Sequence, residues 1–146
     1  MINYKNEYEH SLERFVIAQN GCFDQVLKEL KNEQKKTHWI WFIFPQLKGL
    51  GHSEYAQYYG IDGAKEAKLY LEHPILGPRL ETCLQILEVA KSSAKEIFGD
   101  IDAKKFQSSL TLFLEVEPES PLLNSLLIKF YSGKKDQNSK DLLVAK

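Results

Sequence analysis

Cysteine is scarce in this chain, and its few copies are poorly spaced for metal binding or cross-linking. The 146 residues include two cysteines, Cys22 and Cys83, which lie far apart and form no CxxC pair. Two thiols without a histidine at ligand spacing cannot complete a zinc site. A disulfide or a reactive thiol is the functional alternative, but structural cysteines are commonly buried and inert. We therefore expect no metal, no cofactor and no disulfide.

Long apolar runs and an excess of one charge are also missing. No stretch approaches the roughly 20 apolar residues of a membrane-spanning helix, and the polar N-terminus lacks the apolar core of a secretory signal. The 19 Lys and Arg residues nearly balance the 20 Asp and Glu residues, so the net charge is -1. General nucleic-acid binders usually carry a basic face. These absences predict a cytoplasmic protein without membrane or general nucleic-acid contacts, and they leave its oligomeric state open.

The common catalytic signatures are missing as well. The chain has no GxSxG, no GxxxxGK[ST], no GxGxxG and no HExxH motif. The nearest approach to a phosphate-binding loop is Gly49-Leu50-Gly51, which is short and has no Lys-Ser after it. This tripeptide is more typical of a turn that needs glycine. Sequence motifs therefore indicate no particular reaction, and the candidate site residues are individual side chains.

What is present indicates one globular domain, residues 1–146. The content of 43% hydrophobic and 27% charged residues is ordinary for such a domain. Apolar residues recur at helical spacing, most clearly in the segment 76–87. We predict a mainly α, single compact domain of about seven helices, with an α+β fold containing a few short strands as the alternative. Residues 135–146 are expected to fray as a C-terminal tail.

Capping residues and helix breakers place the ends of several helices. Asp62 is predicted to cap one helix and Asp102 to open another. The run Ser93-Ala94-Lys95-Glu96 has the spacing of a capping box, and Gly99 is expected to close that turn. Ser120, followed by proline at the first helical position, predicts a further helix start.

Aromatic and polar residues are most concentrated in the segment 37–54, THWIWFIFPQLKGLGHSE, which contains both tryptophans and two of the four histidines. Residues 37–44 are ambiguous. Aromatic and β-branched residues favour a strand, whereas Thr37 as an N-cap favours a helix. Pockets combine apolar walls with a few placed polar groups. We therefore predict that His38, Gln46 and at least one tryptophan line one cavity.

Each candidate in this segment also has a purely structural interpretation. His38 could act as an acid or base, or it could bind backbone at the end of an element. One tryptophan ring could stack on a base, while core packing is the alternative for at least one of the two. Ser53 also fits a helix N-cap, and Gln46 also fits a loop hydrogen bond. The substrate-binding candidates here are Trp39, Trp41, Gln46, His52 and Ser53.

A second group of candidates lies further along the chain. Asp102, Lys105 and Ser109 fall at i, i+3 and i+7, on one face of a helix. They could supply a carboxylate for a sugar cation, a cation for phosphate and a hydroxyl; an N-cap with an exposed ion pair is the alternative. Arg79 could bind phosphate or pair with a neighbouring glutamate. The segment 37–53 lacks a carboxylate, so we predict that Asp102 and Lys105 approach it and complete its pocket.

Three blocks of sequence carry a family resemblance. HWIWFIFPQLKGLGHS, YLEHPILGPRL and IFGDIDAKKFQSSLTLF resemble the signature blocks of the bacterial domain of unknown function 1810. The similarity runs from about Leu12 to Leu143. Members are often labelled calpastatin, which implies a protease inhibitor, but that inhibitor is a long disordered repeat chain unlike this one. The order of Asp102, Lys105, two apolar helices and Gly133 is also similar to the C-terminal half of the NADAR superfamily.

The NADAR superfamily includes small N-glycosidases of the riboflavin pathway and enzymes that remove ADP-ribose from guanine. The resemblance implies a hydrolase or N-glycosidase that acts on a nucleotide or ADP-ribosyl substrate. The match is one of pattern and carries over no catalytic residue. Asp102, as a carboxylate for the ribosyl cation, and His38, as an acid or base, are the catalytic candidates from their own chemistry. The alternative is a non-catalytic module that binds a small nucleotide-like molecule or a peptide in an aromatic pocket. A scaffold whose aromatic residues only fill the core is the third interpretation.

Overall fold

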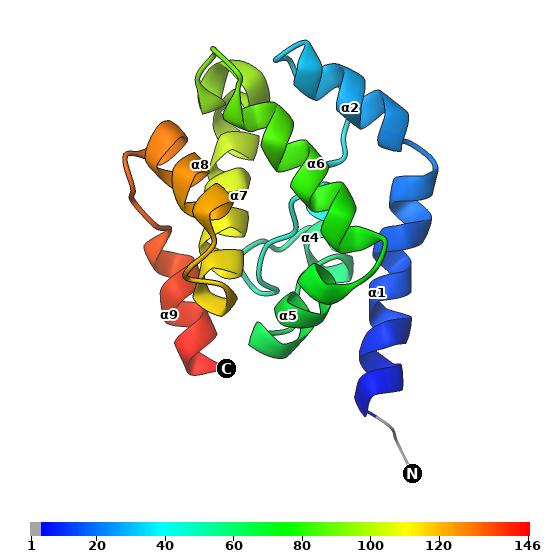
Figure 1. The fold of residues 1–146 in the computed structure, drawn as a ribbon. Coiled ribbons are helices and arrows are strands. Elements are labelled where there is room, and N and C mark those ends of the chain that lie inside the picture. The colour runs from blue at the N-terminus through cyan, green and yellow to red at the C-terminus, as the bar shows by residue number, and fades with distance from the viewer. Residues whose placement is uncertain (1–3) are drawn as a thin grey trace.

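The computed structural model describes residues 4–146, with side chains from Leu12 onward, and the described part consists of helices without a named strand (Figure 1). This confirms the mainly α prediction, and the α+β alternative was wrong for these residues. The described helices exceed the expected number because part of the ambiguous segment 37–44 and most of the C-terminal tail are also helical. The helices are α1 (Tyr4–Asn20), α2 (Phe23–Lys31), α3 (Ile40–Ile43), α4 (Glu54–Tyr58), α5 (Ala64–Glu72), α6 (Leu76–Glu88), α7 (Ala94–Val116), α8 (Pro121–Tyr131) and α9 (Gln137–Ala145).

The ambiguous residues 37–44 contain the short helix α3. The amide of Ile43 donates to the carbonyl of Trp39 at 3.2 Å, and that of Phe44 donates to Ile40 at 3.0 Å. Trp39, not Thr37, is the N-cap residue, because the Thr37 hydroxyl donates to a carboxylate of α2 instead. The helix stops at once, since the following Pro45 has no N–H and fixes its own φ.

Two of the predicted helix starts were wrong. The N-cap of α5 is Gly63, and the amide of Asp62 donates to the Glu66 carboxylate at 2.9 Å. Asp102 lies inside α7, three residues beyond a kink at Gly99, whose φ of 82° departs from the helix. Glycine reaches positive φ without the steric cost of a Cβ, so the kink confirms that Gly99 closes the first turn.

Other predicted caps are confirmed. Ser93 and Glu96 form the capping box, with amide-to-side-chain distances of 3.1 and 2.9 Å. Ser120 accepts from the amide of Leu123 at 3.2 Å at the start of α8. Each such cap stabilises a helix by about 1 kcal/mol, so these local sequence signals fix where α7 and α8 begin.

The core is built around α7, which runs through the middle of the bundle with α8 and α9 along one side and α5 on the other (Figure 1). Phe106 of α7 packs against Phe44 and Phe98, with ring centroids 4.8 and 4.9 Å apart. Burying a side chain of this size contributes roughly 1.5–3 kcal/mol. The close approach of α5 and α6 needs Gly77, because a Cβ there would lie 2.3 Å from the carbonyl oxygen of Leu71.

Residues at the C-terminal end are tied to α7. Asp136 caps α9 by accepting from the amide of Ser139 at 3.0 Å, and it also accepts from the Ser108 hydroxyl of α7 at 3.2 Å. The amide of Asp136 donates to the Thr111 hydroxyl at 2.8 Å. These bonds hold the start of α9 against the central helix.

Two further observations bear on the expectations from composition. Among residues 4–146, no helix combines the length and the apolar character needed to cross a bilayer. Cys22 and Cys83 are both free thiols. Burial raises the pKa of the Cys83 thiol to about 12, so this sulfur stays protonated and unreactive at neutral pH.

Candidate functional site

The aromatic segment and the second half of α7 meet at one place. The Lys105 ammonium lies 4.8 Å from the centroid of the Trp41 ring. On α4, the Tyr55 ring stacks on Trp41 with centroids 4.7 Å apart and planes tilted by 21°. Asp102 Oδ1 lies 3.6 Å from the same ammonium. Asp102 and Lys105 therefore do approach the segment 37–53, and we name Trp41, Tyr55, Lys105 and Asp102 the Trp41–Lys105 face.

A second lysine, which sequence reasoning missed, completes the charge pattern. The Lys35 ammonium lies 2.7 Å from Asp102 Oδ2 and 5.1 Å from the centroid of the Trp39 ring. Its side chain is 5% exposed, although it belongs to a polar run that indicates a solvated loop. The Lys35 amide also donates to the carbonyl of Ile97 at 2.7 Å. Asp102 thus holds two cations, each of which faces a different tryptophan.

Trp39 lies in the core and not on the surface. Its ring is 1% exposed, and its Nε1 donates to Oε1 of Glu29 at 3.0 Å. The buried Glu29 carboxylate also accepts from the Thr37 amide, the Thr37 hydroxyl and the Lys36 amide. Burial alone would raise the pKa of Glu29, but the hydrogen bonds from Thr37, Gln25 and Lys36 lower it to about 2. Sequence reasoning missed Glu29, although it falls on the apolar face of α2 beside Val26 and Leu30.

Trp41 occupies a different environment. Its side chain is half-buried, and its Nε1 is buried without a hydrogen-bond acceptor among the residues that the structure describes. The Tyr55 ring of α4 that stacks on Trp41 is open to solvent, with the residue 58% exposed. Buried donors in proteins are nearly always paired. The Trp41–Lys105 face therefore combines an unpaired donor, a cation and exposed aromatic surface.

The remaining candidates of the aromatic segment have simpler positions. Ser53 is the N-cap of α4 and accepts from the amide of Ala56 at 3.1 Å. Gln46 is buried, and its carbonyl accepts from the amide of Ile61 at 2.9 Å next to an isolated bridge. His38 and His52 are exposed. Among the described residues, the ion pairs and ring contacts of the Trp41–Lys105 face involve neither histidine.

The other two candidates lie apart from the face. Arg79 donates to Gln19 and Asn20 at 3.4 and 2.9 Å, and its guanidinium lies 5.1 Å from the Phe23 ring centroid. It therefore ties α6 to α1 and α2. Ser109 lies on a buried face of α7 and is 2% exposed. Neither residue adds to the surface around Trp41.

The structure also contains a groove of about 890 Å³ between α5, α6 and α8. None of the predicted site residues lines it. The sequence placed the pocket in the segment 37–53, because that is where aromatic and polar residues are concentrated. The groove instead forms where three amphipathic helices meet, which no local pattern indicates.

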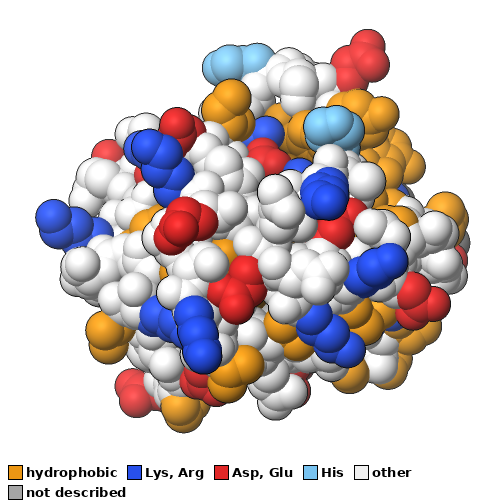
Figure 2. Space-filling model, turned by 90° about the horizontal axis from the view of Figure 1, so that it is seen from above, with side chains coloured by type: hydrophobic (Ala, Val, Ile, Leu, Met, Phe, Trp, Pro, Cys, Tyr) orange, Lys and Arg blue, Asp and Glu red, His pale blue; other side chains and the backbone are white. Residues whose placement is uncertain are grey.

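Charge is evenly distributed on the face seen from above. Figure 2 shows Lys and Arg side chains interspersed with Asp and Glu, without a region of one sign. A phosphate backbone is bound through clustered cations. This face offers no such cluster.

The sequence of this chain matches a known protein family. The family model described as "Protein of unknown function (DUF1810)" matches residues 9–143. The chain belongs to the DUF1810 family. This confirms the resemblance carried by the three sequence blocks. Comparison with curated proteins found no match.

A solved structure has the same fold as this DUF1810 chain. It is the crystal structure of the conserved hypothetical protein Rv1873 from Mycobacterium tuberculosis, with a TM-score of 0.89 and 42% sequence identity. The match covers 92% of this chain and 97% of that chain. Since neither description states an activity, function has to be argued from the site.

Proposed function

We propose that this DUF1810 protein binds a small nucleotide-like molecule at the Trp41–Lys105 face. The observation that carries the proposal is the buried Nε1–H of Trp41, which lacks an acceptor within the described residues. Leaving a buried donor unpaired costs about 1–3 kcal/mol. A carbonyl or phosphate oxygen of a ligand would remove that cost once the Tyr55 ring, which stacks on Trp41 and is 58% exposed, moves aside to open a path to this buried atom.

The groups around Trp41 suit the two ends of a nucleotide. Tyr55 stacks on Trp41 and exposes ring surface, and stacking of a base on an aromatic ring contributes about 1–3 kcal/mol. The ammonium of Lys105, with its side chain 25% exposed, can form a charge-assisted hydrogen bond to a phosphate oxygen. Asp102 orients this lysine from the side of α7.

The position of Asp102 favours binding over hydrolysis. In the N-glycosidase hypothesis, which follows the NADAR resemblance, its carboxylate stabilises a ribosyl cation. That carboxylate is already flanked by the ammonium groups of Lys35 and Lys105, at 2.7 and 3.6 Å. Two adjacent cations reduce its capacity to stabilise a third positive charge. We therefore assign Asp102 the role of positioning Lys105, and the non-catalytic module is the function that the geometry supports best.

Calorimetric titration with adenosine, AMP and ADP-ribose tests the proposal. Trp41→Phe keeps the ring but removes the N–H, and should weaken AMP binding about five- to tenfold. Lys105→Gln should weaken AMP and ADP-ribose binding while leaving adenosine binding unchanged. Lys28→Gln, an exposed lysine of α2, is the matched control and should change neither.

Two outcomes distinguish the alternatives. If none of the three compounds binds the wild-type protein, the proposed function is wrong. Mass spectrometry of the compounds after incubation separates binding from turnover. Intact ligand supports a binding module, whereas release of the base would restore the N-glycosidase hypothesis with Asp102 as a catalytic residue.

A further inference from the structure

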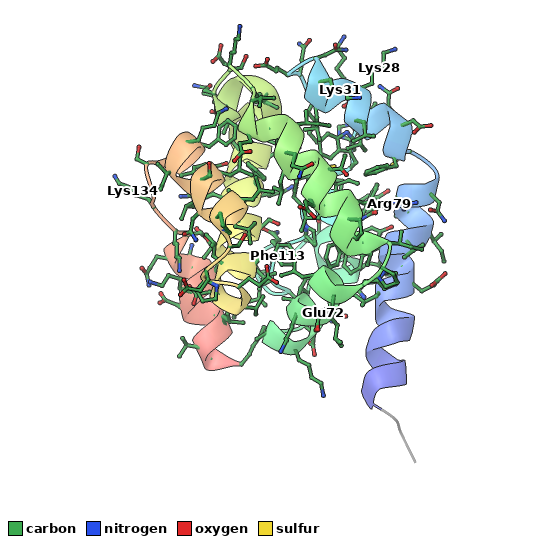
Figure 3. All side chains as sticks on the ribbon, viewed as in Figure 1. Lys28, Lys31, Glu72, Arg79, Phe113 and Lys134 are labelled. Atoms are coloured by element: carbon green, nitrogen blue, oxygen red, sulfur yellow. The ribbon has the colours of Figure 1, made fainter. Side chains whose placement is uncertain are left out.

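The groove between α5, α6 and α8 has an apolar floor and an acidic rim. Its volume is about 890 Å³, within the range of sites that bind ligands or peptide segments. The floor is formed by leucine side chains from all three helices, which are Leu71, Leu80, Leu84, Leu122 and Leu123. The rim carries four carboxylates, which are Glu72, Glu81, Glu88 and Glu117. Figure 3 labels Glu72, beside α5 and below α6.

None of these four carboxylates forms an ion pair with a described side chain, although the Lys129 ammonium lies beside the Glu88 end of the groove and donates to the backbone carbonyl of Glu88 at 2.6 Å. No lysine or arginine is among the described residues that line the groove. Nδ1 of His73 accepts from the amides of Ile75 and Leu76 at 3.1 and 3.2 Å, so this ring is held against the backbone at the start of α6.

The negative charge of the groove comes from its four glutamates and not from helix dipoles. Both α5 and α7 end beside the groove, at Glu72 and Val116, but α6 and α8 begin there, at Leu76 and Pro121. The partial negative charges of the first two helix ends are therefore offset by the partial positive charges of the other two. The chain as a whole has a net charge of only -1. The groove is therefore a local concentration of negative charge in an otherwise balanced protein, and this charge disfavours any acidic occupant.

We propose that this groove docks a basic amphipathic helix of a partner protein. Glu81 and Glu88 lie seven residues apart on α6, which separates them by about 10.5 Å along the helix axis. A docked helix with cations seven residues apart repeats this spacing. Its apolar side chains at i+3 and i+4 then lie over Leu84, which lines the groove between the two carboxylates.

The shape of the groove also suits a helix. The α6 wall from Gly77 to Glu88 extends over about 16 Å, or three helical turns. Helix-in-groove recognition uses apolar anchors on one face of the incoming helix and charges at its borders. The leucine floor and glutamate rim provide the complementary surface for both features.

Fluorescence anisotropy with a labelled synthetic Leu–Lys amphipathic helix tests the proposal on the full chain. The double variant Glu81→Gln and Glu88→Gln should weaken binding about fivefold, as expected for two partly exposed ion pairs. The matched control is Glu13→Gln with Asp24→Asn, which changes the net charge equally at exposed positions outside the groove. This control should change affinity less than about twofold.

Three results would overturn the inference. They are equal losses in both double variants, equal binding of a scrambled peptide of the same composition, and complete competition by spermidine, which carries charge without an apolar face. NMR shift mapping should place the perturbed amides on α6 and α8. Because Trp41 and Lys105 do not line the groove, failure here leaves the proposed nucleotide binding unaffected.

Discussion

The ammonium of Lys105 lies 4.8 Å from the Trp41 ring centroid and 3.6 Å from Oδ1 of Asp102. Lys35 repeats this arrangement with Trp39 and the other carboxylate oxygen of Asp102. Alternating aromatic rings, cations and one carboxylate therefore connect α7 to the segment that carries both tryptophans. The arrangement holds the exposed face around Trp41 in a fixed position against the central helix.

Asp102→Asn should destabilise the fold by about 1–3 kcal/mol, because the largely buried ammonium of Lys35 loses its charged partner. Asp100→Asn is the control, since its ion pair with Lys95 is 78% and 75% exposed and should contribute less than about 1 kcal/mol. Urea unfolding of both variants measures the difference. Equal stability of the two variants would show that the Asp102 ion pairs do not hold α7 to the aromatic segment.

The same substitution should affect the stability of the protein at Trp39 but hardly at Trp41. Trp39→Phe removes the N–H that Glu29 accepts, and should cost about 1–3 kcal/mol of unfolding free energy. Trp41→Phe removes a donor that has no acceptor within the described residues, and should leave stability within about 1 kcal/mol of wild type. Thermal unfolding checks both variants. A large loss in Trp41→Phe would reveal a structural partner for its indole.

Stability should fall steeply in acid because of Glu29. Its folded pKa of about 2 lies below its ordinary value of 4.5, so the stabilisation is complete above about pH 4.5 and is lost as the pH falls towards 2. Glu29→Gln should be about 2–4 kcal/mol less stable at neutral pH, because two or more donors lose a charged acceptor. Its unfolding free energy should change less between pH 5 and pH 3 than that of wild type. Parallel pH profiles for the two proteins would contradict this assignment.

Gly77→Ala should be strongly destabilising, by about 1–3 kcal/mol or more, because the new Cβ meets a backbone carbonyl of α5 that cannot move freely. At Gly63, a Cβ would meet nothing within 4 Å, so Gly63→Ala is the control and should change stability by about 1 kcal/mol or less. Comparison of their urea midpoints measures the close packing of α5 on α6.

Local signals in the sequence determined the helical class and several helix ends. The spacing of Leu76, Leu80 and Leu84 predicted α6, and the Ser93–Glu96 box predicted the start of α7. These signals act within one or two turns, so they do not depend on the rest of the chain. Asp62 and Asp102 were misplaced as caps because a capping residue type by itself does not show which nearby residue begins the helix.

Only the tertiary structure decided which tryptophan is buried and which charges meet. In a helical segment, residues two apart point about 200° apart, so Trp39 enters the core and Trp41 reaches the surface. A strand would have placed them on one side, and the sequence of residues 37–44 is compatible with both. Lys35 and Asp102 pair across 67 positions of chain, and the acidic groove combines α5, α6 and α8. Such contacts depend on how helices pack, which is set by the whole buried surface and not by any local run of residues.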